Sequence, residues 1–175
     1  MSDILSMIKS KRAVIFDLFH TLTTIERSWG PFTHEILGVS YDAWNEQLLE
    51  NSPDRLDGRL TDPLEIIGTL ARNIDPDISD EIIAKAVKSR AARFRKAVVE
   101  IPENNLRVLA SLKENGKKIA LISNADASEI EGWGDSPLSS LLDEVIFSCE
   151  VGSQKPKPEI YQICLQDDHI LLRSD

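Results

Sequence analysis

The chain has 175 residues, 42% hydrophobic and 28% charged, an ordinary composition for a globular protein able to bury one good core. Its formal net charge of −9 argues against nonspecific binding to nucleic acid or to an anionic membrane surface. No apolar stretch approaches the roughly 18 residues of a membrane span and no signal-peptide core is present, so with two cysteines we expect a cytoplasmic protein with free thiols.

The first predicted strand is the apolar run of residues 14–16, which delivers one carboxylate, Asp17. Such a run is typical of a strand buried on both faces of a parallel sheet. In open parallel sheets ligands bind beyond the carboxyl ends of the strands, where Asp17 is expected. A partly desolvated carboxylate there can be a covalent nucleophile or a metal ligand. Before this strand, apolar residues at positions 4, 5, 7 and 8 predict a short amphipathic helix.

Residues 25–99 contain no convincing strand. Helical periodicity predicts helices over residues 31–37, 41–50, 63–73 and 80–99. Asp62 and Ser79 are the predicted N-caps of the last two. Arg90, Arg93, Arg95 and Lys96 form a basic run, which we interpret as a solvated helix face that balances nearby acids. The alternative is a surface that attracts an anionic substrate.

Strands and helices alternate in the rest of the chain. The pattern predicts helices over residues 102–115, 137–142 and 158–165, and strands over residues 118–123 and 145–149. Gly116 is the predicted stop of the first of these helices. The sequence therefore predicts an α/β fold, a parallel sheet with a helical insertion after its first strand.

Three segments carry residues in the order and spacing of a known hydrolase family. Residues 17–21, Asp-Leu-Phe-His-Thr, resemble a first motif that is usually Asp-x-Asp-Gly-Thr. The strand ending in Ser123 resembles the second motif, and Lys155 in Lys-Pro-Lys-Pro-Glu resembles the third. Together they resemble the haloacid dehalogenase-like hydrolases. The resemblance implies a Rossmann-like core of residues 1–24 and 100–175 and a helical cap, residues 25–99, that closes over the site.

The resemblance also implies a chemistry, hydrolysis of a phosphate ester or a carbon–halogen bond through an aspartyl ester. By matching position, Asp17 would be the nucleophile and a Mg²⁺ ligand. Thr21 and Ser123 would hold the transferring group, and Lys155 would neutralise charge. Donors aimed at developing negative charge lower the barrier without solvent reorganisation.

Phe19 departs from the phosphatase pattern, which has a second Asp there as general acid and base. Phenylalanine cannot transfer a proton, and such help is worth roughly 100- to 10,000-fold. Dehalogenases of the superfamily carry an aromatic residue here, and a halide leaves without a proton. His20, in place of the usual Gly, either relays protons or packs locally. Asn124 either helps to position the substrate or caps the next helix.

The family's fourth motif, a strand ending in acidic Mg²⁺ ligands, has no clear match. Asp167 and Asp168 follow no apolar strand, so we expect a solvated tail, with substitute metal ligation as the alternative. The C-terminal part of the core is expected to be incomplete, which would leave residues 14–16 at a sheet edge. Such an edge invites pairing with another chain. We therefore predict a homodimer through this edge or its coverage by residues 170–172.

The prediction from sequence is a phosphate-monoester phosphatase that uses Mg²⁺ on a small molecule. Two alternatives remain. The first is a metal-free hydrolase of a 2-haloacid, for which Arg27 is a candidate anchor of the substrate carboxylate. The second is a catalytically inert or truncated binding protein of the same fold. Neither nucleic acid nor a membrane is an expected partner.

Overall fold

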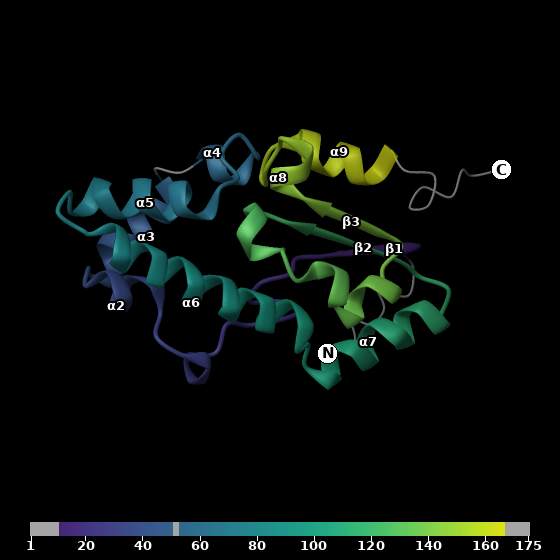
Figure 1. Cartoon of the computed structure of the whole chain (residues 1–175). Coiled ribbons are helices and arrows are strands. Elements are labelled where there is room, and N and C mark those ends of the chain that lie inside the picture. The colour runs from purple at the N-terminus through teal and green to yellow at the C-terminus, as the bar shows by residue number, and fades with distance from the viewer. Residues whose placement is uncertain (1–10, 51–52, 167–175) are drawn as a thin grey trace.

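A three-stranded parallel sheet lies at the centre of the protein (Figure 1). The computed structural model describes residues 11–50 and 53–166, so the predicted N-terminal helix and the tail with Asp167 and Asp168 lie outside the described residues. The strand order is β1 (Ala13–Phe16), β2 (Lys118–Ser123), β3 (Glu144–Phe147). The register pairs Phe16 with Leu121 and Ser123 with Phe147, which brings the carboxyl ends of the strands to one edge.

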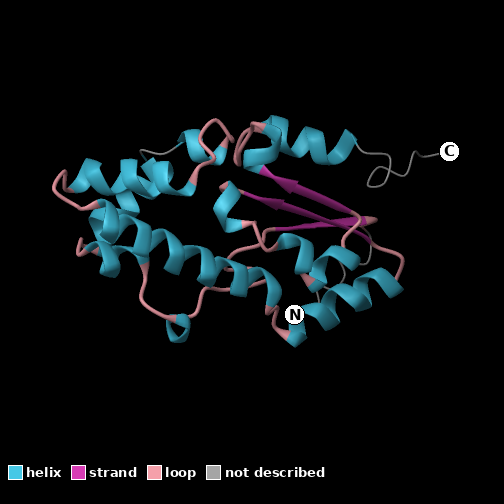
Figure 2. Cartoon of the chain, viewed as in Figure 1, coloured by secondary structure: helices cyan, strands magenta, loops and turns pink. Residues whose placement is uncertain are grey.

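Helices cover both faces of this sheet (Figure 2). Successive side chains of β2 point to opposite faces. Ile119 and Leu121 belong to the cluster that includes Leu109 of α7 (Glu103–Glu114). Ala120 and Ile122 pack on the other face against α9 (Pro158–Gln166). Burial on both faces explains why the strand is an uninterrupted apolar run.

A separate group of helices lies beyond the edge to which the strands point (Figures 1 and 2). Its members are α2 (Thr33–Leu37), α3 (Tyr41–Glu50), α4 (Pro53–Leu56), α5 (Pro63–Ile74) and α6 (Asp80–Val99). All of these helices except α4 contribute to one hydrophobic cluster, which contains Leu37, Trp44, Ile66, Ile67, Leu70, Ala71, Ile78, Ile83 and Ala86. The predicted α/β fold with a helical insertion after the first strand is confirmed.

The predicted N-caps of two of these helices are also confirmed. The Asp62 carboxylate accepts a hydrogen bond from the Glu65 N–H at 2.8 Å, at the start of α5. The Ser79 hydroxyl accepts one from the Ile82 N–H at 3.4 Å, at the start of α6. Each cap satisfies a backbone donor that the first helical turn leaves unpaired.

Two predicted elements differ in the structure. Residues 137–142 were expected to form an α-helix, but Pro137–Ser140 is a 3₁₀ helix (η4) closed by tighter bonds such as Leu141 N–H to Leu138 C=O. The strand predicted to end at Cys149 ends at Phe147, because α8 (Ser148–Val151) begins there. The Ser148 hydroxyl accepts from the Ala125 N–H at 3.1 Å, which fixes this early end beside β2.

The interpretation of the basic run as a solvated face was wrong for Arg90 and Arg93. Their side chains are buried, with only 5% and 3% of each residue exposed. The two positions are three residues apart and share the inward face of α6 with Phe94. Arg95 is exposed on the outer part of the helix and pairs with Asp135 at 2.5 Å.

The outer edge of β1 is unpaired within the part of the chain that the structure describes. Ile15 is 39% exposed, and α9 contacts β2 and β3. The homodimer through this edge stays a prediction, and residues 170–172, its alternative cover, lie outside the described residues. None of the described helices is long and apolar enough to cross a membrane.

The helical group meets the core through a close backbone contact. Gly58 follows α4 with a φ of 75°, a left-handed conformation that favours glycine. A Cβ placed on Gly58 would lie 2.0 Å from the carbonyl oxygen of Cys149 in α8. On α6, the Ala97 C=O accepts a hydrogen bond from the Thr23 hydroxyl at 2.6 Å.

Gly58→Ala is expected to lower the free energy of unfolding by about 2 to 5 kcal/mol, because the added methyl would overlap the Cys149 carbonyl in a left-handed conformation. Gly38→Ala is the matched control. Its φ of 73° is similar, but nothing lies within 4 Å of the added Cβ, so we expect a loss of about 1 kcal/mol. Urea unfolding measures both. Equal losses would show that the contact contributes nothing.

Candidate active site

Asp17 and Lys155 form an ion pair at the carboxyl edge of the sheet. The Lys155 Nζ lies 2.7 Å from Asp17 Oδ1, and the Asp17 side chain remains 45% exposed. The same oxygen accepts the Leu18 N–H at 2.8 Å, and Lys155 Nζ also donates to the Ile122 C=O at 2.9 Å. The structure thus brings together two residues that are 138 positions apart. Both printed contacts of the partly exposed Asp17 carboxylate are made by one of its oxygens, Oδ1.

Asn124 holds the loop that carries Lys155. Its side-chain amide donates to the Lys155 C=O at 3.0 Å, and its carbonyl oxygen accepts the Lys155 N–H at 2.7 Å. This two-point contact fixes the backbone from which the lysine reaches Asp17. Asn124 also lines the cavity described below, so the same side chain holds the Lys155 backbone and borders the cavity. Its role in positioning a substrate stays a prediction.

Ser123 and Thr21 present two different kinds of hydroxyl. Ser123 is the last residue of β2, 1% exposed, and its Oγ has no hydrogen-bond partner among residues 11–50 and 53–166. Buried polar groups are nearly always paired, so an unpaired buried hydroxyl is a candidate hydrogen-bond donor to a ligand. Thr21 lies in the exposed turn that follows Asp17, where its N–H donates to the Leu18 C=O at 3.3 Å.

The same turn carries Phe19 and His20. The His20 N–H donates to the Thr23 C=O at 2.6 Å, and His20 has a φ of 63°, where a glycine would be less strained. The Phe19 ring packs edge-to-face on Phe94 of α6, with 5.1 Å between the ring centroids. The position at which a phosphatase motif places an acid is therefore part of an aromatic wall.

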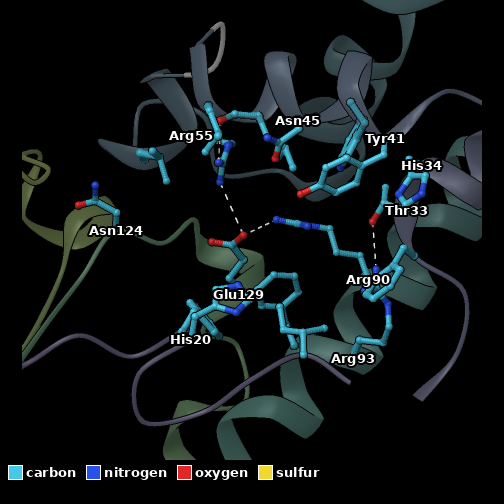
Figure 3. A pocket seen from close by; sticks show the side chains of 18 of the residues that line it. His20, Thr33, His34, Tyr41, Asn45, Arg55, Arg90, Arg93, Asn124 and Glu129 are labelled. Carbon is cyan, nitrogen blue, oxygen red and sulfur yellow. Dashed lines mark hydrogen bonds and ion pairs between the residues drawn. The ribbon is translucent and has the colours of Figure 1, made fainter. Parts of the chain in front are cut away.

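A cavity of about 740 Å³ separates this edge of the sheet from the helical group (Figure 3). The core contributes Phe19, His20, Asn124 and Glu129, and most of the remaining wall comes from α2, α3, α4 and α6. A cavity of this size, with apolar walls and a few polar groups, is typical of a small-molecule site.

Four buried charges join the two sides of the cavity. Asp126 and Glu129 follow β2, whereas Arg55 and Arg90 belong to α4 and α6. The Arg55 guanidinium donates to Asp126 Oδ2 at 2.9 Å and lies 3.7 Å from Glu129, and Arg90 pairs with Glu129 and lies 3.5 Å from Asp126. Figure 3 shows Glu129 between the two arginines.

The two carboxylates respond differently to this setting. Burial works to raise the pKa of Asp126, but the charges of Arg90 and Arg55 and a hydrogen bond from Ser128 outweigh it, and the pKa is lowered. Burial, helped by the negative charge of Asp126, raises the pKa of Glu129. Of the two carboxylates, Asp126 is the one whose charged form the arginines stabilise more strongly.

Sequence reasoning missed Arg55, Asp126 and Glu129. A signal was present: Asp126 and Glu129 have the spacing of a capping box directly after a predicted strand. Asp126 Oδ1 accepts the Ser128 N–H at 3.0 Å, and Glu129 Oε2 accepts the Asp126 N–H at 2.9 Å. Nothing in the sequence around Arg55 marks it as their partner.

Asp17 is the one predicted metal ligand that the structure describes. The described residues contain no group of three or more His, Cys, Asp and Glu side chains that could hold a metal ion. Mg²⁺ commonly keeps several waters and binds through one or two carboxylates plus substrate phosphate. Asp17, with one oxygen not used by Leu18 or Lys155, fits such substrate-assisted binding.

Comparisons with known proteins place this geometry in a family. The family model described as haloacid dehalogenase-like hydrolase matches residues 11–167. Among solved structures, a haloacid dehalogenase family enzyme from Bacteroides thetaiotaomicron, in complex with magnesium and inorganic phosphate, has a TM-score of 0.62 and 20% identity, covering 91% of this chain and 79% of that one. An L-2-haloacid dehalogenase also has a TM-score of 0.62 and 20% identity, covering 93% and 74%. At such identities these structures show the fold alone, and no curated protein matches the chain.

Asp126→Asn is expected to lower the free energy of unfolding by about 3 to 5 kcal/mol. The substitution removes one of the two carboxylate charges that face the buried guanidinium groups of Arg55 and Arg90. Asp135→Asn is the matched control. It removes the exposed partner of Arg95, for which about 1 kcal/mol or less is expected. Chemical denaturation of the two variants gives the comparison, and similar losses would mean that the buried network does not hold the helices to the core.

Proposed function

The chain belongs to the haloacid dehalogenase-like hydrolases, and on this premise we propose that it hydrolyses a small phosphate monoester through a covalent intermediate on Asp17. The observation that carries the proposal is the Asp17–Lys155 pair at 2.7 Å, set at the carboxyl edge of the sheet close to residues that line a cavity. Ligands of open parallel sheets bind at this edge. In the proposal, residues 25–99 serve as a cap that selects the substrate.

In the proposed first step, a carboxylate oxygen of Asp17 attacks phosphorus, and the bond from phosphorus to the leaving oxygen breaks. The leaving group departs with the bonding electrons as an alkoxide or phenolate. Lys155 stabilises the negative charge, and the unpaired Ser123 hydroxyl donates to a phosphoryl oxygen, with Thr21 as a second donor. In the second step water attacks the aspartyl phosphate, which releases inorganic phosphate and restores the Asp17 carboxylate.

Phe19 gives this chemistry a restriction. With a phenyl ring at the position of the general acid, the leaving group receives no proton from that residue. The reaction then favours esters of acidic alcohols, whose anions leave unaided. His20, exposed and lining the cavity, is the proposed acceptor of the proton from the attacking water.

Magnesium is part of the proposal. Asp17 and the Phe19 backbone carbonyl would hold Mg²⁺ together with a phosphate oxygen of the substrate. The ion would neutralise phosphate charge and orient the group for attack. The cytoplasmic location predicted from the two cysteines, Cys149 and Cys164, stays a prediction.

Dehalogenation is the second candidate, and Phe19 favours it. In that reaction Asp17 attacks the carbon that bears the halogen, the halide leaves with the bonding electrons, and water hydrolyses the ester to a hydroxy acid. No proton is needed at Phe19. The predicted carboxylate anchor, Arg27, lines the cavity but is ion-paired with Glu35, so it would have to exchange partners.

Phosphate release from p-nitrophenyl phosphate, with and without Mg²⁺, tests the main proposal. We expect Asp17→Asn to abolish activity, and Lys155→Met to lower kcat about 100- to 1000-fold, the effect of losing one charge-stabilising donor. Lys157→Met, in the same loop, is the matched control and should retain full activity. Activity that survives Asp17→Asn would contradict the mechanism.

Halide release from 2-chloropropionate, measured on the same preparations, separates the alternatives. Halide release without phosphate release would transfer the proposal to dehalogenation. Absence of both reactions would favour an inert binding protein of this fold.

The restriction set by Phe19 has its own test. The ratio of kcat/KM for p-nitrophenyl phosphate to that for phenyl phosphate should fall about 100-fold in Phe19→Asp, because an acid then protonates the poorer leaving group. Phe19→Asn, of the same size but without a proton to transfer, is the control and should keep the steep ratio. An equal ratio in both variants would show that Phe19 does not limit the choice of leaving group.

A further inference from the structure

Arg93 is a buried cation that lacks an acidic partner. It is 3% exposed, and no carboxylate within the described part of the chain lies within ion-pair distance of it. One terminal nitrogen of its guanidinium donates to the Thr33 hydroxyl at 3.1 Å, and its Nε has no hydrogen-bond partner among the described residues. A buried charge without a counter-ion is costly, and in proteins such charges are usually paired.

The charges around the cavity do not balance without a ligand. Arg55 and Arg90 are matched by Asp126 and Glu129, which leaves the charge of Arg93 in excess. Glu35 attracts Arg93 from a distance but is already paired with the exposed Arg27. Burial, with the repulsion of Arg90, lowers the pKa of Arg93 to about 10, so the group is still cationic at neutral pH.

Arg93 lines the cavity that Phe19, His20 and Asn124 also line, and these three residues are sequence neighbours of the proposed catalytic residues Asp17, Thr21 and Ser123. In Figure 3, Arg93 and Thr33 lie on one side of the cavity, His20 and Asn124 lie on the opposite side, and Glu129 lies between them. The cavity lining also includes apolar side chains such as Phe19, Phe94 and Leu48. The Arg93 guanidinium carbon is 5.0 Å from the centre of the Phe32 ring, which orients the group by a cation–π contact.

We propose that Arg93 binds a second anionic group of the substrate, a carboxylate or a phosphate, at the end remote from the reacting phosphate. The substrate class is then a small phosphomonoester with an apolar body and an oxyanion at its far end. A guanidinium offers planar, paired donors that match either oxyanion. The identity of the reacting end rests on the proposed function, whereas the oxyanion site rests on Arg93 alone.

Calorimetric titration of the full chain with phosphonates that cannot be hydrolysed tests this inference. The probes are benzylphosphonate, 4-carboxybenzylphosphonate and 1,4-xylylenediphosphonate. Wild type should bind the two probes that carry a second oxyanion about 10- to 100-fold more tightly than benzylphosphonate, which is the usual gain from a hydrogen bond to a charged group. In Arg93→Met this preference should fall below about threefold. The carboxylate and phosphonate arms show which oxyanion the site prefers.

Arg95→Met is the matched control on the same helix. Arg95 is exposed and paired with Asp135, so its loss should leave the preference intact. Arg93→Lys keeps the charge but not the planar fork, and should retain a reduced preference even if Arg93→Met fails to fold. Absence of any preference in wild type, or its persistence in Arg93→Met, would overturn the inference.

Titration with 4-methylbenzoate separates this inference from the proposed function. Binding that depends on Arg93, in a protein that releases no phosphate, would uphold the oxyanion site and reject the phosphatase. Phosphate release without any preference for the second oxyanion would reject the site and uphold the phosphatase.

Discussion

A buried network of two arginines from the helical group and two carboxylates from the loop after β2 is the interaction on which the rest of the architecture depends. Each of these charges alone would be strongly unfavourable in the interior. Arg55 and Arg90 supply the positive charge, and Asp126 and Glu129 each contact both of them. The network is complete only when the helices are docked on the core, so it stabilises one arrangement of the two parts.

That arrangement creates the cavity and sets its chemistry. One wall contains Asn124, Phe19 and His20 at the edge of the sheet. Asn124 also holds the Lys155 backbone, and Lys155 reaches Asp17. The opposite wall is helical and contains Arg93. Because the network uses both carboxylates to balance its own arginines, none remains for Arg93. The need for structural charge balance at the centre thus leaves a cation at the far end of the cavity, and a cation there is a basis for selecting ligands.

In the proposed mechanism, the carboxyl edge of the sheet carries the reacting groups and the helical wall of the cavity binds the substrate. Phe19 packs on Phe94, so the residue beside the proposed nucleophile helps to form the apolar wall and cannot supply a proton. The proposed chemistry then depends on charge stabilisation by Lys155 and on the leaving group itself. In the same proposal, the apolar surface of the cavity and Arg93 bind the substrate. Selectivity and rate would therefore be set by different residues on opposite sides of one cavity.

The sequence by itself determined the elements and the residues that depend on near neighbours. The apolar run that ends at Asp17, the caps Asp62 and Ser79, and the strand ending in Ser123 could be predicted because each follows from a local pattern of hydrophobicity or from a backbone group two or three residues away. The family and its helical insertion followed from motifs of the same local kind.

Only the tertiary structure decided which charges are buried and what they contact. Arg90 and Arg93 belong to a basic run that the sequence predicts to be solvated, yet both are buried. Arg90 packs against Glu129 of the core, and Arg93 packs against Phe32 and Thr33 of the helical group. Arg55 meets Asp126 across 71 positions of sequence, and Arg90 meets Glu129 across 39. The physical reason is that burial and ion pairing depend on which surfaces pack together, and a pattern along the chain records the periodicity of a helix but not the partner its faces will meet.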